Sequence, residues 1–349
     1  MRDAFFAMAV FFPPEWYPQQ RVLFSFPQRS GDWGSHLGTA SRALTRAILA
    51  VDRVTPVTVL LPDEAHARRF LPPRFLPGPQ GQGIGIPLND NWIRDYGPIT
   101  VRREGRPTLL DFTFDGWDGK FAADLDNTAT VRLHEAGVLP WDSPPYAYQK
   151  IPLTLEGGSL ETDGRGTLLT TTKCLLETDR NPGTTRSEME AALHDHLGVE
   201  HFLWLEHGEL LGDDTDAHID TLARFLDPET IAYVSCETPS DPHYEPLARM
   251  REELTAFRTA TGQPYRLLPL PLPAPAHADD GHRLPATYAN FLLSNGHLFL
   301  PTYADALDAT VADLLRRETD YTVVPLDCRP FIEQHGSLHC LTMQLPRFS

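Results

Sequence analysis

The sequence predicts an α/β fold, built from five similar units within one domain that spans residues 1–349. Segments with the apolar alternation of strands recur with segments that have helical spacing, in the order strand, helix, strand. Each unit takes about sixty to seventy residues, which is the scale of radial or stacked repeats. A chain of 349 residues can also bury a substantial core. A radial arrangement would bring the inner strands to one centre, and an ordinary open α/β sheet is the alternative.

The first two units are predicted from short apolar runs. In the first, the strand Val-Leu-Phe-Ser-Phe at 22–26 is followed by a helix at 37–51 and a strand at 57–61. The second unit has strands at 83–88, 99–101 and 109–114. Its helix is the least clearly predicted of the five.

The remaining three units follow the same order. The third has strands at 155–161 and 167–171, a helix at 185–197 with Ser187 as its start signal, and a strand at 202–205. The fourth has strands at 221–225 and 231–236, a helix at 244–259 and a strand at 265–270. The fifth has strands at 290–294 and 297–300 joined by the hairpin signal Asn295-Gly296, a helix at 306–317 and a strand at 322–326.

Charge limits the class of partner. Acidic residues outnumber lysine and arginine by 47 to 30, which gives a formal net charge of −17 and a pI near 5.2. Nucleic acid is therefore not an expected partner, because phosphate binding needs clustered basic side chains. A cationic small molecule would be attracted, although the same charge could serve only to keep the protein in solution.

Two further features bear on location. The apolar run at 4–12 is too short to cross a bilayer, and it lacks the positive flank and cleavage site of a secretion signal. No membrane partner is expected. The four cysteines are widely spaced and follow no CxxC pattern, so neither a zinc ribbon nor a disulfide framework is predicted. A reducing, cytoplasmic location is the simplest fit.

Cys340 is a candidate nucleophile near the end of the sequence. It lies in the strand-like segment Leu-His-Cys-Leu-Thr at 338–342, where alternation would turn it away from its two neighbours. A thiol attacks as the thiolate, and a cationic neighbour or a bound cation would stabilise that form. The alternative role is that of a small buried apolar side chain.

His218 and Glu156 are the candidate base and its partner. His218 follows the acidic segment at 213–216, at the point where an ordered element would begin. Glu156 precedes two glycines that allow the backbone to approach a ligand closely, and its carboxylate could orient the imidazole. A capping histidine and an incidental acid in a turn are the alternatives.

Asp95 and Asp220 are the candidate groups for binding a cation. Two carboxylates can each accept paired N–H donors from a planar guanidinium, which leaves its central carbon open to attack. Trp92 could form a cation-π wall, and Arg94 in the same Trp-Ile-Arg-Asp segment is placed with the substrate-binding residues. A surface Asp and Arg pair and a packed tryptophan are the structural alternatives.

These residues lie in segments that resemble the family of agmatine deiminases and bacterial-type peptidylarginine deiminases, within the wider group of guanidino-modifying enzymes. The resemblance extends from Pro13-Pro14-Glu15-Trp16 to Gln344-Leu345-Pro346. Its most specific segments are Trp92 to Pro98, Glu156-Gly157-Gly158, Gly166 to Thr171 with Cys174-Leu175-Leu176, Arg180-Asn181-Pro182, Asp213 to Asp220, and Leu338 to Thr342.

The resemblance implies a five-bladed α/β propeller, the pentein fold, with its active site on a pseudo-fivefold axis. It implies that Cys340 is the nucleophile, His218 the general acid and base, and Glu156 its partner, with Asp95 and Asp220 as the guanidinium clamp. The implied reaction, in putrescine biosynthesis, is hydrolytic deimination of agmatine to N-carbamoylputrescine and ammonia through a covalent amidino-cysteine, without metal or other cofactor. Deimination of peptidyl-arginine or free arginine, amidino transfer and non-catalytic arginine binding are the alternatives.

The sequence departs from the family pattern beside the predicted site. Gln334-His335-Gly336-Ser337 stands where the agmatine enzymes usually have three glycines and an asparagine. Ala217 takes the place of a glycine, and Asp118 rather than glycine follows Trp117. These changes spare the reacting groups, so they leave the identity of the guanidino substrate open more than the type of reaction. A homo-oligomer is compatible with the sequence.

Overall fold

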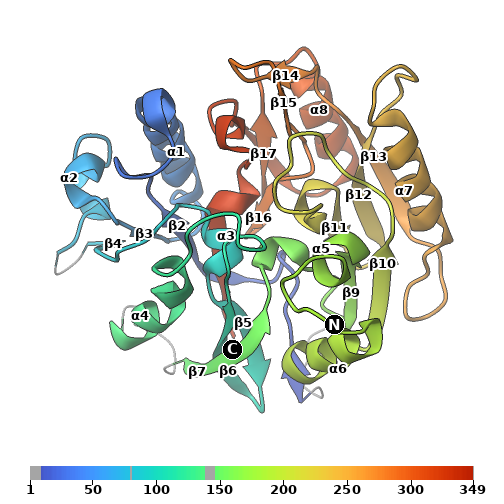
Figure 1. Cartoon of the computed structure of the whole chain (residues 1–349), viewed down its shortest axis with the longest axis horizontal. Helices are drawn as coiled ribbons and strands as arrows, with labels where there is room; N and C mark the ends of the chain where they lie inside the picture. Colours follow the sequence, from blue (N-terminus) through green and yellow to red (C-terminus); the bar gives the residue numbers. More distant parts are fainter. Residues whose placement is uncertain (1–8, 79–80, 138–145, 349) are drawn as a thin grey trace.

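The computed structural model describes residues 9–78, 81–137 and 146–348. Within these ranges the strands form five sheets of three or four strands each and one two-stranded ribbon. The five longest helices in the described ranges lie at the periphery of the molecule, where they follow one another in chain order (Figure 1). They are α1 (Leu37–Val51), α4 (Ala129–Glu135), α6 (Arg186–Leu197), α7 (Tyr244–Ala256) and α8 (Asp308–Glu318).

One pairing pattern recurs in all five sheets: a first strand pairs antiparallel with a second, which pairs parallel with a third. The first sheet consists of β19 (Thr342–Pro346), β2 (Gln19–Ser25) and β3 (Val57–Leu60), with β4 (Gly83–Ile84) at its edge. The second consists of β5 (Ile99–Arg103), β6 (Arg106–Thr113) and β7 (Ala147–Thr154), with β1 (Val10–Phe11) at its edge.

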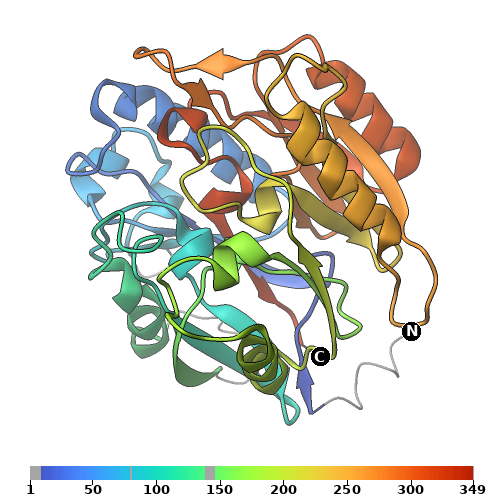
Figure 2. The same ribbon diagram turned by 45° about the vertical axis from the view of Figure 1, so that its right-hand side comes forward.

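The other three sheets each contain three strands. The third has β8 (Glu161–Thr162), β9 (Thr167–Thr171) and β10 (His201–Leu205), and the fourth has β11 (Ala223–Asp227), β12 (Thr230–Ser235) and β13 (Arg266–Pro271). The fifth has β16 (Leu292–Ser294), β17 (His297–Thr302) and β18 (Thr322–Asp327). Figure 2 shows α7 and α8 on the outer side of the fourth and fifth sheets. The two-stranded ribbon consists of β14 (Ala276–His277) and β15 (Arg283–Leu284).

Local sequence explains where the helices form. In α1, the buried residues Ala40, Ala43, Leu44, Ala47 and Ile48 recur at intervals of three or four and cover one face. Helix α6 begins at a capping box, in which the Thr185 side chain accepts from the Glu188 amide and Glu188 accepts from the Thr185 amide. It ends at Gly198, whose φ of 71° is a left-handed conformation that glycine adopts without a steric cost.

The structure corrects several predicted boundaries. The 83–88 segment contributes β4 to the first sheet and not to the second, because it pairs parallel with β3. The 155–161 segment is mainly a helical turn, η5 (Gly157–Ser159), with only its last residue in a strand. Helix α6 is capped by Thr185 and not by Ser187, because the paired glutamate lies three residues after Thr185.

The two ends of the chain also differ from the predicted pattern. Residues 10–11 of the apolar run at 4–12 form β1, while 4–8 lie outside the described residues. The C-terminal strand β19 completes the first sheet by pairing with β2, which the order of the repeats along the sequence does not indicate. No helix within the described ranges combines the length and apolar composition that a bilayer crossing requires.

Candidate active site

Short helical turns carry the predicted site residues, each just before the first strand of a sheet. These turns are α3 (Ile93–Tyr96) before β5, η5 before β8, η6 (Ile219–Thr221) before β11 and η8 (His339–Leu341) before β19. Turn α3 contacts η5 and η8, and η5 contacts η6. Turn η8 replaces the strand predicted at 338–342, so alternation does not decide where Cys340 points. Asn290, just before β16, is the equivalent residue of the fifth sheet.

A cavity of about 320 Å³ opens beside these turns. Of the predicted site residues, Trp92, Asp95 and Cys340 line it. His218, Glu156 and Asp220 are almost fully buried, with exposed fractions of 1%, 0% and 0%. Of the predicted reacting and clamp groups, the thiol of Cys340 and the carboxylate of Asp95 are therefore the two that line the cavity, whereas His218, Glu156 and Asp220 are buried behind it.

Cys340 sits between an amide side chain and a carboxylate. Its Sγ lies 3.3 Å from Asn290 Nδ2, 3.5 Å from Asn290 Oδ1 and 3.8 Å from Asp220 Oδ2. Burial raises the pKa of the Cys340 thiol well above its usual value, and the negative charges of Asp220 and Asp95 raise it further. The thiol is therefore protonated in the unliganded protein at neutral pH, and a bound cation would favour the thiolate.

Asp95 is held by neighbours from two other segments. The Trp117 indole donates to its Oδ2 at 3.0 Å, and the Gly158 amide donates to its Oδ1 at 3.0 Å. Burial raises the pKa of the Asp95 carboxyl well above its usual value, with Asp220 and Glu156 adding to the effect. A cation placed between Asp95 and Asp220 would relieve this repulsion between carboxylates.

Asp220 has one oxygen engaged and one free. Its Oδ2 accepts from His339 Nδ1 at 2.7 Å, whereas its buried Oδ1 has no hydrogen-bond partner among the described residues. Burial acts to raise the pKa of Asp220, but the hydrogen bond and charge of His339 outweigh it, so the net shift is downward. Asp220 is therefore a buried carboxylate with one oxygen that has no hydrogen-bond partner among the described residues.

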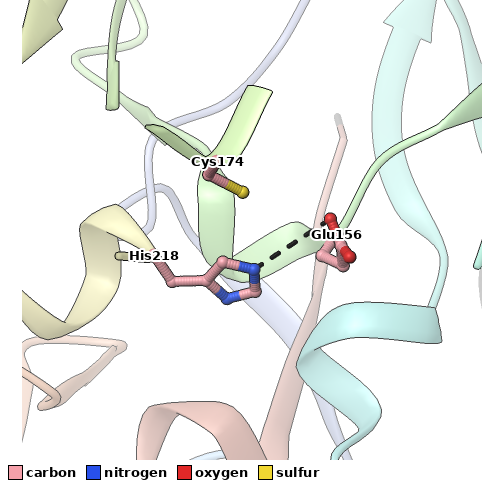
Figure 3. Close-up of side chains that lie close together, drawn as sticks. All are labelled: Glu156, Cys174 and His218. Carbon is pink, nitrogen blue, oxygen red and sulfur yellow. Dashed lines mark ion pairs between the residues drawn. The ribbon is translucent and has the colours of Figure 1, made fainter. Parts of the chain in front are cut away.

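His218 lies between its predicted partner Glu156 and the clamp residue Asp95. Its Nδ1 is 3.6 Å from Asp95 Oδ1, and its Nε2 is 4.0 Å from Glu156 Oε2 (Figure 3). Neither His218 Nε2 nor Glu156 Oε2 has a hydrogen-bond partner among the described residues. Burial lowers the pKa of His218 to about 3, against the opposing charge of Asp220, so the ring is neutral at neutral pH.

Glu156 is bound more tightly to Arg180 than to His218. Arg180 Nε donates to Glu156 Oε1 at 2.6 Å, and both side chains are fully buried. Cys174 also lies beside His218 (Figure 3), and ligand atoms of Glu156, Cys174 and His218 come within 4.8 Å of one another. Such a set could hold a metal ion, but the Arg180 guanidinium beside Glu156 would repel it. We therefore assign no metal to this cluster.

Trp92 lies at the cavity wall, whereas Arg94 lies away from the cavity. Trp92 lines the cavity and packs on Trp33 with ring centroids 5.9 Å apart. A side chain at Gly336 would collide with the Trp92 ring, because a Cβ there would lie 2.2 Å from it. Arg94 does not line the cavity: its guanidinium lies 3.7 Å from Glu15 and donates to the His339 carbonyl at 3.4 Å.

Several contacts in the site could not be predicted from any one segment of the sequence. Asn290 is a polar residue directly before the apolar run Phe-Leu-Leu, which is a weak signal of its role beside Cys340. Arg180 lies in one of the family segments, but the sequence does not indicate that it pairs with Glu156. The sequence likewise does not indicate that the Trp117 indole donates a hydrogen bond to Asp95.

Comparison with known proteins adds independent information. A family model described as Porphyromonas-type peptidyl-arginine deiminase matches residues 11–346. An agmatine deiminase of Stutzerimonas stutzeri (strain A1501) is 32% identical over 359 residues, covering 96% of this chain and 95% of that protein. A Porphyromonas gingivalis structure, provisionally named an arginine deiminase, matches with TM-score 0.89 at 44% identity over 97% of this chain and 98% of that one. A C. jejuni agmatine deiminase with a cysteine changed to serine and substrate bound matches with TM-score 0.86 at 34% identity, over 97% and 96% of the two chains.

Proposed function

The chain belongs to the Porphyromonas-type peptidyl-arginine deiminase family, and on that premise we propose that it hydrolyses agmatine to N-carbamoylputrescine and ammonia. It is a hydrolase that acts on the C–N bonds of a guanidino group. The observation that carries the choice of agmatine is the charge of the cavity, whose lining is rich in carboxylates and contains no lysine or arginine among the described residues.

Three acids of this lining that are at least partly exposed are called the outer acids here: Asp32, Asp90 and Asp214. Burial raises the pKa of Asp90 to about 6, and the charges of Asp32 and Asp214 contribute to the same shift. Burial also raises the pKa of Asp214 to about 6, despite the opposing charge of His335. Carboxylates that disfavour one another's ionisation are stabilised by a cation placed among them.

Agmatine matches this charge pattern better than arginine does. It carries a guanidinium at one end and an ammonium at the other, and it has no carboxylate. The carboxylate of free arginine would meet like charges, which cost several kcal/mol when brought together without a counter-ion. Of the residues that line the cavity, His335 alone could carry a positive charge.

The proposed mechanism begins with a guanidinium bound between Asp95 and Asp220. The Cys340 sulfur adds to the central carbon as its proton passes to His218, which then protonates the departing nitrogen so that ammonia leaves. A covalent amidino-cysteine remains. His218 next takes a proton from water, whose oxygen attacks the same carbon. The C–S bond then breaks, the Cys340 sulfur regains a proton from His218, and the ureido product loses its extra proton to solvent and leaves. Glu156, opposite His218 Nε2, stabilises the imidazolium that forms twice in this sequence.

We propose that the five sheets form a five-bladed α/β propeller around the site, as one catalytic domain. The recurring strand pairing and the peripheral helices in chain order support this arrangement. Each sheet also contributes a residue just before its first strand, including Asp95, Glu156 and Cys340. The four cysteines, all without a disulfide, fit the cytoplasmic location that the proposal includes.

A panel of four guanidines tests the substrate assignment by ammonia release. Agmatine should give the highest kcat/KM, and butylguanidine, which lacks the ammonium, should be at least about tenfold lower because it leaves the outer acids without a counter-ion. Free arginine should be at least about a hundredfold below agmatine, since its carboxylate adds like-charge repulsion. A blocked arginine peptide completes the panel.

The pH dependence of KM provides the control within this panel. As pH falls through about 6, Asp90 and Asp214 gain protons and lose their attraction for an ammonium. The KM for agmatine should therefore rise on acidification, and the KM for butylguanidine should change less. A higher kcat/KM for arginine or the peptide than for agmatine would replace agmatine as the substrate.

Replacing Gly158 with alanine should disturb the site without a change of charge. A Cβ at this position would lie 2.5 Å from His218 Nδ1 and 2.8 Å from Asp95 Oδ1, so both groups must move. Displacements of about 1 Å cost on the order of 10²-fold in rate, and we expect kcat/KM for agmatine to fall by about that factor. Gly38→Ala is the matched control, because its nearest neighbour would be 3.7 Å away. Equal activities of the two variants would contradict the assigned geometry.

A further inference from the structure

His339, the residue before Cys340, is buried between two carboxylates. Its Nδ1 lies 2.7 Å from Asp220 Oδ2 and its Nε2 lies 2.6 Å from Glu15 Oε2, while its exposed fraction is 1%. Ionised carboxylates only accept hydrogen bonds, and a neutral imidazole has a single N–H donor. Two such contacts are satisfied together when the ring is an imidazolium, with both nitrogens donating.

Glu15 is itself fixed as a carboxylate. The Leu293 amide donates to its Oε1 at 2.6 Å, and its Oε2 lies 3.0 Å from Arg224 Nη2 and 3.7 Å from Arg94 Nη2. Burial acts to raise the pKa of Glu15, but His339 and Arg224 outweigh it and lower the pKa below its usual value. The acceptor that faces His339 Nε2 therefore stays charged.

The buried group around His339 is balanced in charge when the ring is protonated. Three acidic and three basic side chains with exposed fractions of at most 6% meet there: Glu15, Glu161, Asp220, Arg94, Arg224 and His339. A neutral ring would leave an excess negative charge among these buried side chains, which is strongly unfavourable. Charge balance therefore agrees with the hydrogen-bond geometry.

The contacts of His339 determine which oxygen of Asp220 is available. Since Oδ2 is engaged by Nδ1, Oδ1 is left without a partner, and it is the atom of Asp220 free to accept from a guanidinium. The His339 amide also donates to Asn290 Oδ1 at 2.8 Å, and Asn290 Nδ2 contacts the Cys340 sulfur. One short turn thus fixes both the nucleophile and one arm of the clamp.

We propose that His339 is a positioning residue for substrate binding, which holds Asp220 ionised with Oδ1 toward the guanidinium. Glu15 in turn holds the His339 ring so that both of its nitrogens donate. The inference rests on the proposed function, because it assigns Asp220 to the guanidinium. It adds a residue near the start of the sequence, Glu15, to the groups on which recognition of the substrate depends. Neither His339 nor Glu15 reacts.

A pair of alkylating reagents of equal size separates this role from general support of the fold. 2-Chloroacetamidine is a cation that needs the carboxylate clamp, whereas 2-chloroacetamide is neutral, and in both the Cys340 sulfur displaces chloride. Each rate of alkylation is divided by the rate with free cysteine, and the ratio of the two corrected rates measures cation recognition. Loss of structure alone would change both rates together and leave the ratio unchanged.

His339→Ala should lower this ratio by about 10- to 100-fold, the range expected for losing a hydrogen bond between charged groups. His339→Asn keeps a neutral donor near Asp220, so its ratio should be at least about threefold higher than that of the alanine variant. Glu15→Gln should fall between wild type and His339→Ala. The KM for agmatine should rise in the same order.

His66→Asn is the matched control, because His66 is also buried and hydrogen-bonded, to Ser41 at 2.8 Å, in a part of the chain outside the cavity. Its ratio should equal that of wild type. If His339→Ala does not fold, as judged by its unfolding transition, His339→Asn and Glu15→Gln decide the test. A wild-type ratio near one would overturn the proposed function, whereas a high wild-type ratio that His339→Asn, Glu15→Gln and His339→Ala all retain would overturn the role of His339 alone.

Discussion

Replacing Cys340 with alanine is expected to reduce ammonia release from agmatine by at least about 10⁴-fold, as the loss of a covalent nucleophile commonly does. No other described cysteine can take over, because Cys340 is the one cysteine that lines the cavity. The rate is measured by ammonia release over enzyme concentrations that cover this range. Turnover at the wild-type rate would exclude Cys340 as the nucleophile.

The same variant should still bind agmatine. The two clamp carboxylates and the outer acids are intact in Cys340→Ala, and removing the sulfur takes away no positive charge. Titration calorimetry should therefore give a Kd within about tenfold of the wild-type KM. Cys236→Ala is the control, since Cys236 is partly exposed and does not line the cavity, and it should leave both rate and binding unchanged.

The elements that the sequence predicted well are those with a long, regular apolar pattern. Helix α1 begins and ends at the predicted residues 37 and 51, and the strands and helices of the fourth and fifth units lie within a few residues of their predicted limits. The strand predicted at 155–161 is wrong, because the two glycines in this segment form the turn η5. Pattern recognition works where one face of an element is buried along its whole length.

Pairings between distant segments were beyond the reach of the sequence. Strand β19 joins β2 across almost the whole chain, and a strand pattern contains no information on its partner. The candidate site residues could be named one by one from their chemistry, but the residues that hold them in place could not. Arg180 beside Glu156 and Glu15 beside His339 are contacts between loops, which no periodicity indicates.

The protonation state of His218 follows from its burial, which the sequence does not indicate. An exposed histidine beside an acid would be partly protonated near neutral pH. Burial has the opposite effect here, because it lowers the pKa of His218 to about 3 while raising that of Cys340. Over the neutral range the two groups together therefore hold one proton, which resides on sulfur until the substrate binds.

This shared proton determines how activity should depend on pH. Above pH 3 and below the raised pKa of the thiol, the number of protons on Cys340 and His218 does not change, so wild-type kcat should be nearly constant from about pH 6 to 8. In the wild type, His218 takes the thiol proton during the reaction. A higher pH should therefore not increase the amount of reactive thiolate. A rise of about tenfold per pH unit in the wild type would show that solvent, and not His218, takes the proton.

Replacing His218 with asparagine should remove that internal transfer. We expect kcat to fall by about 10²- to 10⁴-fold, the usual contribution of a general acid and base. The residual kcat should now rise with pH, because Cys340 must lose its proton to solvent and the thiolate fraction grows about tenfold per unit below the thiol pKa. Steady-state rates of both proteins between pH 6 and 8 measure this difference in slope. A small loss of kcat with an unchanged, flat profile would assign the proton transfer to another residue, and the buried position of His218 opposite Glu156 would then require a structural explanation.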